Sequence, residues 1–338
     1  MAATLYTGNG STQSISNAVN SVSFQPDLVW LKSRSIVASN ELIDAVRGAE
    51  KTLYSNLTNA EDITSPTVTA FNSNGFSVGA VYGANTNAAT YVGWQWKAGG
   101  TAVSNTAGTI TSSVSANTTA GFSVVTYTGN GTGGATVGHG VQVGGVATAP
   151  SFIIVKNRGT TATDWECYQI TLGNTYRIRL NRAFAADTGG ALWANTTPTS
   201  TVFSVASDLD VNSSSETYVA YCWAPVAGYS AFGSYTGNGS ADGPFIYTGF
   251  RPRWILIKSS TVATSWYLLD SARETYNEEK IFLYPDLSQA DSPQSAGVDF
   301  LSNGFKVRAG AGLGINNSSG GYIYAAFAEN PLKYANAR

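Results

Sequence analysis

The chain has 338 residues, enough for two or three domains that each bury a core. Charged residues make up only 12%, the net charge is −2, and the basic residues form no stripe, which excludes a nucleic-acid binder. Aromatic residues at 12% exclude a disordered chain, and abundant Thr, Val, Tyr and Gly favour an all-β protein. No run of eighteen apolar residues is present, so we expect no membrane-spanning helix. The first residues, MAATLYTGNG, lack the basic and apolar regions of a secretory signal.

The string YTGNG occurs at Tyr6–Gly10, Tyr127–Gly131 and Tyr235–Gly239. Each copy begins a segment about as long as one small domain, so the sequence predicts one structural unit used three times. Asn-Gly favours a two-residue hairpin, because both turn positions then have positive φ. We therefore predict structural turns at the following residues: Asn9, Gly10, Asn130, Gly131, Asn238 and Gly239. The alternative role for these turns is glycan binding.

Two further strings recur in each unit. Apolar runs extend from a proline to a lysine, at Pro26–Lys32, Pro150–Lys156 and Pro252–Lys258, and predict strands buried on both faces. Closing strands follow at the end of each unit, with large apolar groups at every second position: Tyr91–Trp96, Tyr218–Trp223 and Tyr322–Phe327. This period of two predicts a core face.

The predicted fold class is all-β, with three tandem jelly-roll-like β-sandwich repeats. The expected repeats span residues 1–98, 121–233 and 234–338. Residues 99–120, rich in Ser, Thr, Asn and Gly, are expected to form a linker or an extended arm, although the alternation in ITSSVS leaves a strand open.

Acidic, thiol and imidazole groups are the candidate site residues of this sequence. Asp44 with Arg47, and Asp270 with Arg273, are predicted to form structural ion pairs at strand ends. Cys167 and Cys222 are expected to be small buried hydrophobic residues. His139 lies between glycines and is expected in a turn. The chain has no second histidine, which excludes a histidine-rich zinc site.

A glycosidase needs two carboxyl groups, and three pairs were considered: Asp164 with Glu166, Asp208 with Asp210, and Glu278 with Glu279. None recurs in the other units, so we expect no catalytic residue and no cofactor. The string Asp208-x-Asp210-x-Asn212 begins like a calcium loop, but Ser213 and Val219 replace the required Gly and bidentate acid, so no metal site is predicted. Calcium bound by other loop oxygens stays open.

Trp193 lies in the Gly-rich string GGALWANT, away from the core-phase tryptophans. We therefore predict that Trp193 is exposed and contacts a glycan, because flat aromatic side chains can stack on sugars.

Several segments resemble the repeated β-rich domains in virion proteins of marine bacteriophages. They are Trp96–Gly131, Pro150–Gly159, Tyr218–Pro252 and the final AAFAENPLKYANAR. The resemblance covers the second and third repeats well and the first more loosely. It implies a particle component, exposed on the virion and without catalytic activity, but it supplies no catalytic residue to transfer.

The leading expectation is a tail-fibre or host-attachment protein that binds bacterial surface glycans through several sandwich modules. The alternative is a capsid decoration protein that stabilises the head, and it is favoured by the expected absence of an attachment region before Tyr6. A polysaccharide depolymerase is the third hypothesis. Expected partners are tail or major capsid proteins, a host glycan and further copies of this chain, for instance in a trimer. No nucleic acid or membrane insertion is expected.

Overall fold

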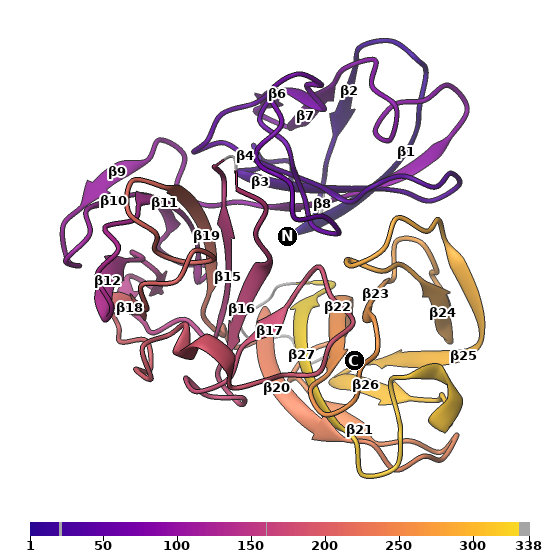
Figure 1. Ribbon diagram of the computed structural model, residues 1–338. Helices are drawn as coiled ribbons and strands as arrows, with labels where there is room; N and C mark the ends of the chain where they lie inside the picture. Colours follow the sequence, from indigo (N-terminus) through magenta and orange to yellow (C-terminus); the bar gives the residue numbers. More distant parts are fainter. Residues whose placement is uncertain (20–21, 160, 331–338) are drawn as a thin grey trace.

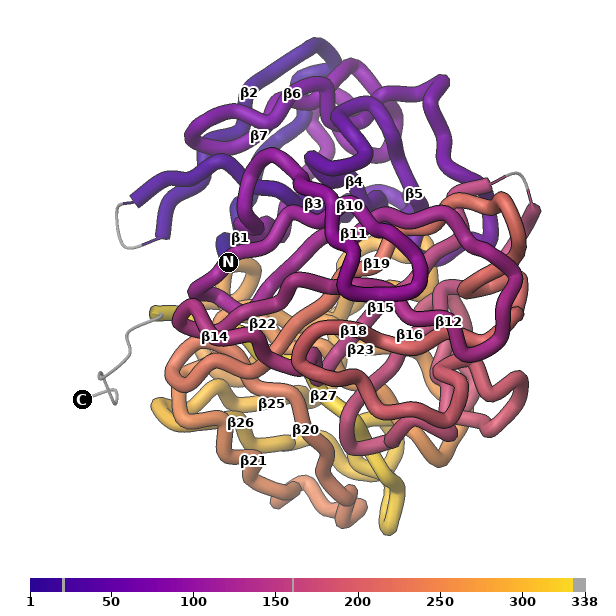
Figure 2. Tube along the Cα trace, turned by 90° about the vertical axis from the view of Figure 1, so that its left-hand side faces the viewer, coloured from indigo at the N-terminus to yellow at the C-terminus, as the bar shows by residue number. Residues whose placement is uncertain are grey.

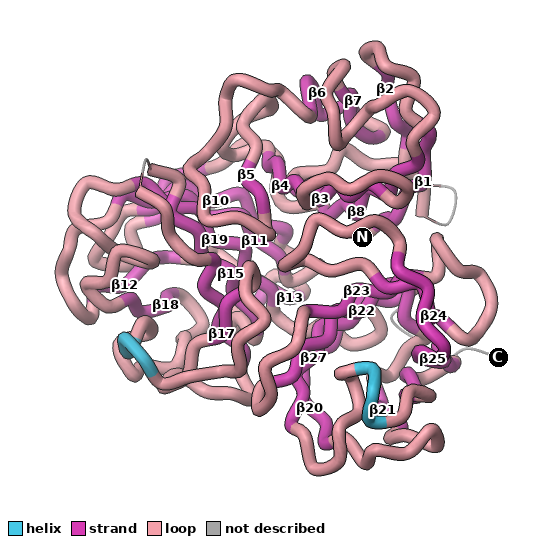
Figure 3. The backbone as a smooth tube through the Cα atoms, turned by 45° about the vertical axis from the view of Figure 1, so that its right-hand side comes forward, coloured by secondary structure: helices cyan, strands magenta, loops and turns pink. Residues whose placement is uncertain are grey.

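Strands dominate the computed structural model, which describes residues 1–19, 22–159 and 161–330. Its named strands pair antiparallel. Within these residues the helical structure is limited to two short 3₁₀ turns at the periphery, η1 (Gly189–Ala191) and η2 (Ala311–Leu313) (Figure 3). The prediction of an all-β sandwich fold is confirmed.

The sheets group into three modules: module 1 (residues 1–98), module 2 (residues 99–224) and module 3 (residues 225–330). Each module has one larger sheet. In sheet order, the strands are β1 (Ala2–Thr7), β8 (Thr90–Trp96), β3 (Leu28–Ser33), β4 (Glu41–Asp44) and β5 (Leu53–Tyr54) in module 1; β17 (Ile178–Arg179), β16 (Trp165–Gln169), β15 (Phe152–Asn157), β19 (Thr217–Trp223), β11 (Phe122–Thr128), β10 (Ser112–Asn117) and β9 (Val103–Asn105) in module 2; and β20 (Ser230–Thr236), β27 (Gly321–Ala328), β22 (Pro252–Ser259) and β23 (Trp266–Asp270) in module 3.

A smaller sheet covers the outer face of each larger sheet (Figure 1). Its strands are β2 (Gln13–Ser16), β7 (Gly75–Val78) and β6 (Val68–Asn72) in module 1; β12 (Ala135–Gly138) and β18 (Val202–Val205) in module 2; and β21 (Phe245–Tyr247), β26 (Gly304–Val307), β25 (Ser292–Leu301) and β24 (Glu279–Phe282) in module 3. Module 2 also has a short hairpin, β13 (Gln142–Val143) and β14 (Val146–Ala147).

Two segments differ from the expected repeat boundaries. Residues 99–120 contribute β9 and β10, which extend the sheet of module 2 beside β11. Strand β20 begins at Ser230 and pairs with β27 along its whole length, so it crosses the predicted boundary between residues 233 and 234. Residues 331–338 of the predicted third repeat lie outside the described residues.

Strands β3, β15 and β22 of the larger sheets are buried on both faces, as predicted for the proline-to-lysine strands. In β3, Val29 and Leu31 face the small sheet of module 1, whereas Leu28 and Trp30 face a core shared by all three modules. Strands β15 and β22 alternate in the same way. The period of two thus places one side chain in a module's own core and the next in the common core.

The common core lies where the three lobes of Figure 1 meet. The Trp96 ring of module 1 lies 6.1 Å from the Trp223 ring of module 2. It also lies 5.6 Å from Trp254 and 5.6 Å from Phe327, both in module 3. The remaining cavity at this junction is about 10 Å³, the space of roughly one water molecule. The centre is therefore packed core rather than a ligand site. Figure 2 shows modules 1 and 3 at opposite ends of the molecule.

Hydrogen bonds close the three modules into a ring. The buried lysine that ends each proline-to-lysine run donates to a backbone carbonyl of one neighbour: Lys32 to Ser288 (3.1 Å), Lys156 to Thr58 (3.1 Å) and Lys258 to Ala183 (3.4 Å). A second set uses side-chain N–H groups at the beginning of β4, β16 and β23: Asn40, just before β4, donates to Tyr284 (2.9 Å), Trp165 to Tyr54 (2.9 Å) and Trp266 to Arg179 (2.7 Å). In both sets module 1 contacts module 3, module 2 contacts module 1, and module 3 contacts module 2.

The YTGNG strings form turns, but the predicted two-residue hairpin is wrong. The strand before each string belongs to the larger sheet, and the strand after it belongs to the smaller sheet. The glycines have positive φ, at 71° for Gly10, 70° for Gly131 and 72° for Gly239, whereas the preceding asparagines do not. Both turn positions of a type I′ hairpin need positive φ. The turn instead carries the chain from one sheet to the other.

A buried asparagine near the end of each module holds this turn. In module 3, Asn316 Oδ1 accepts the N–H of Asn238 at 2.8 Å, and its amide donates to Asn238 Oδ1, Ser240 O and Ala309 O at 3.0, 2.7 and 2.8 Å. Asn85 and Asn212 make the corresponding contacts in modules 1 and 2. The turns are thus structural devices, in which the side-chain carbonyl of each turn asparagine is already bound.

Candidate functional site

One equivalent position carries different side chains in the three modules, and we call this position the lateral site. On the strand side it is formed by Glu41, Glu166 or Tyr267, each paired with the residue before the buried lysine. On the loop side it is formed by Gly83, Asp210 or Gly314, each two residues before the buried asparagine. A Cβ on Gly83 would lie 2.8 Å from Glu41 Oε1, and one on Gly314 would lie 2.1 Å from the Tyr267 hydroxyl. The same approach of loop to strand therefore occurs in modules 1 and 3.

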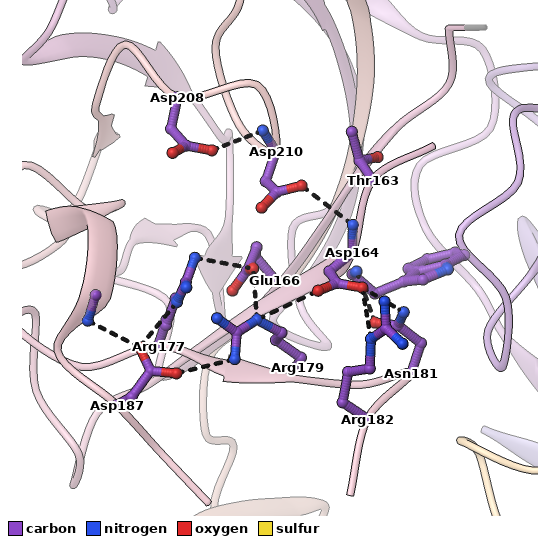
Figure 4. Close-up of polar contacts among 12 residues, drawn as sticks. Thr163, Asp164, Glu166, Arg177, Arg179, Asn181, Arg182, Asp187, Asp208 and Asp210 are labelled. Carbon is purple, nitrogen blue, oxygen red and sulfur yellow. Dashed lines mark hydrogen bonds and ion pairs between the residues drawn. The ribbon is translucent and has the colours of Figure 1, made fainter. Parts of the chain in front are cut away.

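In module 2 the lateral site is highly charged (Figure 4). Arg179 bridges Asp164, Glu166 and Asp187, with N–O distances of 3.3, 3.5 and 2.9 Å. Arg177 lies 3.0 Å from Asp187 and 3.7 Å from Glu166. These arginines stand on and beside β17, so the alternation of YRIRLN directs both toward the acids while Ile178 packs into the common core.

Burial shifts the pKa values of the carboxyl groups at this site. Glu166 is fully buried, and burial raises its pKa well above the usual range, with Asp210 adding to the shift. Both Glu166 oxygens lack a hydrogen-bond partner among the described residues. Burial also raises the pKa of Asp210, with Asp208 next in effect. Because Glu166 is fully buried, its carboxyl group is not accessible to a substrate.

The structure brings together two of the considered carboxyl pairs. Asp164 and Glu166 share Arg179, and the N–H of Asp164 donates to Asp210 at 3.1 Å. Asp208 and Asp210 lie in one loop, where Asp208 Oδ1 accepts the N–H of Asp210 at 2.9 Å. The carboxyl groups of Asp164, Asp208 and Asp210 are thus bound by arginines or backbone amides, whereas Glu166 lies near two arginines without a hydrogen bond among the described residues.

The considered calcium loop serves another purpose. Asn212 is the buried asparagine of module 2, and its amide group binds Asn130 and Thr132. Across the part of the chain that the structure describes, no group of three or more His, Cys, Asp or Glu side chains is arranged to hold a metal ion.

The prediction that Trp193 is exposed is wrong. Its side chain is 1% exposed and packs in the core of module 2, with its ring 5.8 Å from that of Tyr168 in an edge-to-face geometry. The reason is local: the glycines before it form η1, with Gly190 at φ 83°, and the chain turns back so that Leu192 and Trp193 enter the core. Trp193 therefore offers no platform for a sugar.

The thiols and the imidazole are structural. Cys167 and Cys222 are buried free thiols that lie on opposite faces of the sheet, one in the common core and one in the core of module 2. Their interpretation as small hydrophobic residues is confirmed. His139 is buried in the short connection between β12 and β13, accepts the N–H of Val141 at 3.0 Å and contacts Thr199 O at 3.1 Å. Burial lowers the pKa of His139 to about 4, so the ring is neutral at pH 7.

The predicted ion pairs are confirmed and also join modules. Arg47 binds Asp44, and the Tyr221 hydroxyl of module 2 donates to Asp44 at 2.8 Å. Arg273 binds Asp270 at 2.6 Å, and Trp94 of module 1 donates to Asp270 at 3.2 Å. Both pairs are buried, unlike exposed surface pairs, so removal of the arginine would leave the buried aspartate without its cationic partner.

The lateral site of module 3 opens into a cavity of about 380 Å³. Its walls come from β23, the loop before it, β25 and the η2 turn, and its lining contains no charged side chain. Another cavity of about 350 Å³ lies on module 2 and is lined mainly by Ser and Thr with Arg158. The sequence provided no sign of the first cavity, because its residues come from four separate segments.

Fold and sites together define an all-β protein of three joined sandwich modules, with polar cavities rather than a recognisable reaction centre in the described residues. The family model described as Domain of unknown function (DUF7483) matches residues 1–331, and the chain belongs to this family. No curated protein and no solved structure matches the chain. Among the described residues, no helix is long and apolar enough to cross a membrane.

Proposed function

We propose that this protein is a non-enzymatic structural component of a bacteriophage virion, exposed on the particle, which contacts bacterial surface glycans as a tail-fibre or host-attachment protein. Its partners in this role are a tail or capsid protein and the host glycan. Further copies of the chain, for instance in a trimer, would multiply the contacts. Three modules on one chain would raise avidity without a single tight site.

The observation that supports binding over chemistry is the state of the carboxyl groups. Glu166 is fully buried, and Asp164 is occupied by Arg179 and Arg182. A general acid or base must reach the proton it transfers, within hydrogen-bond distance of the substrate. Meanwhile the outer sheets and their loops lie at the periphery, around one packed centre (Figure 1).

Antibody labelling of intact particles by electron microscopy tests the proposal. Signal confined to the tail supports host attachment, and absence of signal from the particles contradicts a virion role. Release of reducing sugar from host polysaccharide by the purified protein would overturn the non-enzymatic assignment and favour a depolymerase.

A capsid decoration protein is the second candidate. The observation that favours it is the ring of three modules, in which each module contacts the next through equivalent lysines. Such a ring presents three similar surfaces around one centre and would suit a threefold position on a shell. Antibody signal spread over the head would favour this role over host attachment.

A further inference from the structure

The cavity of module 3 has a lining that selects for one class of ligand. Its volume of about 380 Å³ lies within the range of small-molecule sites. The side chains that give it polarity are Thr264, Ser265, Tyr267, Tyr284, Gln294 and Asn317, and the η2 turn forms the remaining wall. Every one of these groups is uncharged and can donate or accept hydrogen bonds.

Two tyrosines form the floor of the cavity. Tyr267 and Tyr284 are more than nine-tenths buried, at 8% and 9% exposed, and their rings lie 5.8 Å apart at 62°. Burial raises the pKa of Tyr267 to about 12, so its hydroxyl stays a neutral donor and acceptor. The rings supply flat apolar surface, and the hydroxyls supply polarity at the same place.

Gln294 is held in place at the wall. Its amide nitrogen donates to Ser292 Oγ at 2.9 Å and to Ser292 O at 3.1 Å, and it lies 3.4 Å from the Tyr284 hydroxyl. Because the nitrogen is occupied, the orientation of the amide is fixed. A fixed amide beside the Tyr284 hydroxyl is a built set of polar groups.

The glycines of the η2 turn shape the opposite wall. Gly314 has φ 73°, and a Cβ there would lie 2.1 Å from the Tyr267 hydroxyl, so only glycine permits this approach. Gly312 differs, since a Cβ there would meet nothing within 4 Å. The turn therefore closes tightly over Tyr267 and leaves open space at Gly312.

The other modules show how this site changes with charge. At the equivalent lateral site, module 2 has Glu166 and Asp210 with two arginines, and module 1 has the buried Glu41. Only in module 3 are the strand and loop positions both uncharged, as Tyr267 and Gly314. An anionic ligand would find no cation in this lining, and an apolar ligand would leave the hydroxyl and amide groups unpaired.

We propose that the module 3 cavity binds a neutral glycan unit, with its apolar face against Tyr267 or Tyr284 and its hydroxyls on Gln294, Asn317 and the tyrosine hydroxyls. This inference names the binding site and the charge class of the sugar for the proposed function. The biological role of the cavity rests on that proposed function.

The test is saturation-transfer NMR and calorimetric titration of the full chain with maltose, cellobiose and lactose, and with glucuronic acid as a charged comparison. We expect millimolar or tighter binding of at least one neutral disaccharide, with glucuronic acid binding more weakly. Gln294→Ala and Tyr267→Phe should each weaken binding by about tenfold, the loss expected for one or two hydrogen bonds. Tyr247→Phe, at an exposed tyrosine on β21 outside the lining, is the matched control and should bind as the wild type does.

Gly312→Leu adds bulk at the open wall without a backbone clash, so it should abolish binding while the melting temperature stays near that of the wild type. The proposal is overturned if none of the three neutral disaccharides binds at 50 mM, or if binding persists unchanged in Gln294→Ala, Tyr267→Phe and Gly312→Leu. Particle labelling separates the two proposals. A protein found on particles that binds no sugar defeats only the cavity assignment, and sugar binding by a protein absent from particles defeats only the virion role.

Discussion

At the scale of single residues, this fold uses charged and polar side chains as internal joints. Lys32, Lys156 and Lys258 are buried, and burial lowers the pKa of each to about 8. Each still donates to a carbonyl of the next module. A chain with only 12% charged residues therefore places several of them inside, where burial shifts the pKa of an amine or a carboxyl group toward its neutral form.

Glu41 allows a test of this internal electrostatics. Burial raises its pKa to about 7, so the folded state keeps a proton that the unfolded chain releases above pH ~4.5. The unfolded state then binds fewer protons, and the free energy of unfolding must fall as pH rises from about 4.5 to 7. Glu41→Gln removes this titration. The free energy of unfolding of the variant, relative to that of the wild type, should therefore increase by about 1–3 kcal/mol from pH 4 to pH 8.

Urea unfolding of both proteins at pH 4, 6 and 8 measures this difference. Other buried acids, such as Glu279 with a pKa raised by burial to about 8, titrate in both proteins and cancel. Glu50→Gln, at an exposed position, is the control and should follow the wild type. Parallel pH profiles for Glu41→Gln and wild type would contradict a buried, protonated Glu41.

At the scale of elements, the YTGNG turn and its buried asparagine form one unit made from the two ends of a module. The turn opens the module, and the asparagine precedes the closing strand. In each module that asparagine lies six residues before the tyrosine that begins the closing string, at Asn85, Asn212 and Asn316. The unit ties the connection between the two sheets to the centre of the larger sheet.

Asn316→Ala should destabilise the protein strongly. The change removes three donated hydrogen bonds and one accepted bond at a fully buried position, and it leaves buried groups such as Ala309 O unpaired. We expect a loss of about 2–4 kcal/mol in the free energy of unfolding, measured by urea denaturation. The neighbouring Asn317→Ala, at a partly exposed position, should change stability by less than about 0.5 kcal/mol. Equal losses in both variants would count against the buried asparagine as the anchor.

The sequence predicted these elements to different depths. The proline-to-lysine strands and the aromatic closing strands were predicted correctly, because a continuous apolar run and a period-two pattern both depend only on the local chain. The hairpin was wrong because Asn-Gly specifies a turn and says nothing about which sheet receives the next strand. Trp193 was wrong because composition around it resembled a loop, while the 3₁₀ turn that directs it inward depends on packing against Tyr168. The buried asparagines could have been found from their constant distance to the closing strand.

The lateral site lay beyond sequence reasoning for another reason. The acids of module 2 were identified as pairs, but their arginine partners come from β17 and the surrounding chain, and no spacing rule connects them. The module 3 cavity contains only common uncharged residues from four segments. Neither arrangement leaves a local pattern.

At the scale of the whole molecule, the common core makes three sandwiches into one cooperative body. Each larger sheet gives one face to its own module and one to the centre, so a module removed from the ring would expose that second face. Trp96 contacts aromatic rings of both other modules. We therefore expect the wild type to unfold in a single calorimetric transition.

Trp96→Ala should cost about 3–5 kcal/mol and split that transition, because it opens a cavity where all three modules meet. Phe203→Ala, at a fully buried position in the core of module 2 alone, is the matched control and should lower stability without separating the modules. Differential scanning calorimetry distinguishes the two outcomes by the ratio of calorimetric to van't Hoff enthalpy. A single transition in Trp96→Ala, as sharp as in the wild type, would show that the centre does not couple the modules.

The ring of hydrogen bonds sets an order of events during synthesis. The chain runs from module 1 to module 2 and from module 2 to module 3, so the seam between modules 1 and 3 is closed without a covalent link. That seam is made by contacts such as Arg34 with Asp291 at 2.9 Å and Ser55 with Pro285 O at 2.7 Å. A ribosome must therefore deliver residue 291 before the seam can form, and until then the nascent chain leaves Lys32 and Asn40 without their partners in module 3. Completion of the last module is the step that seals the first.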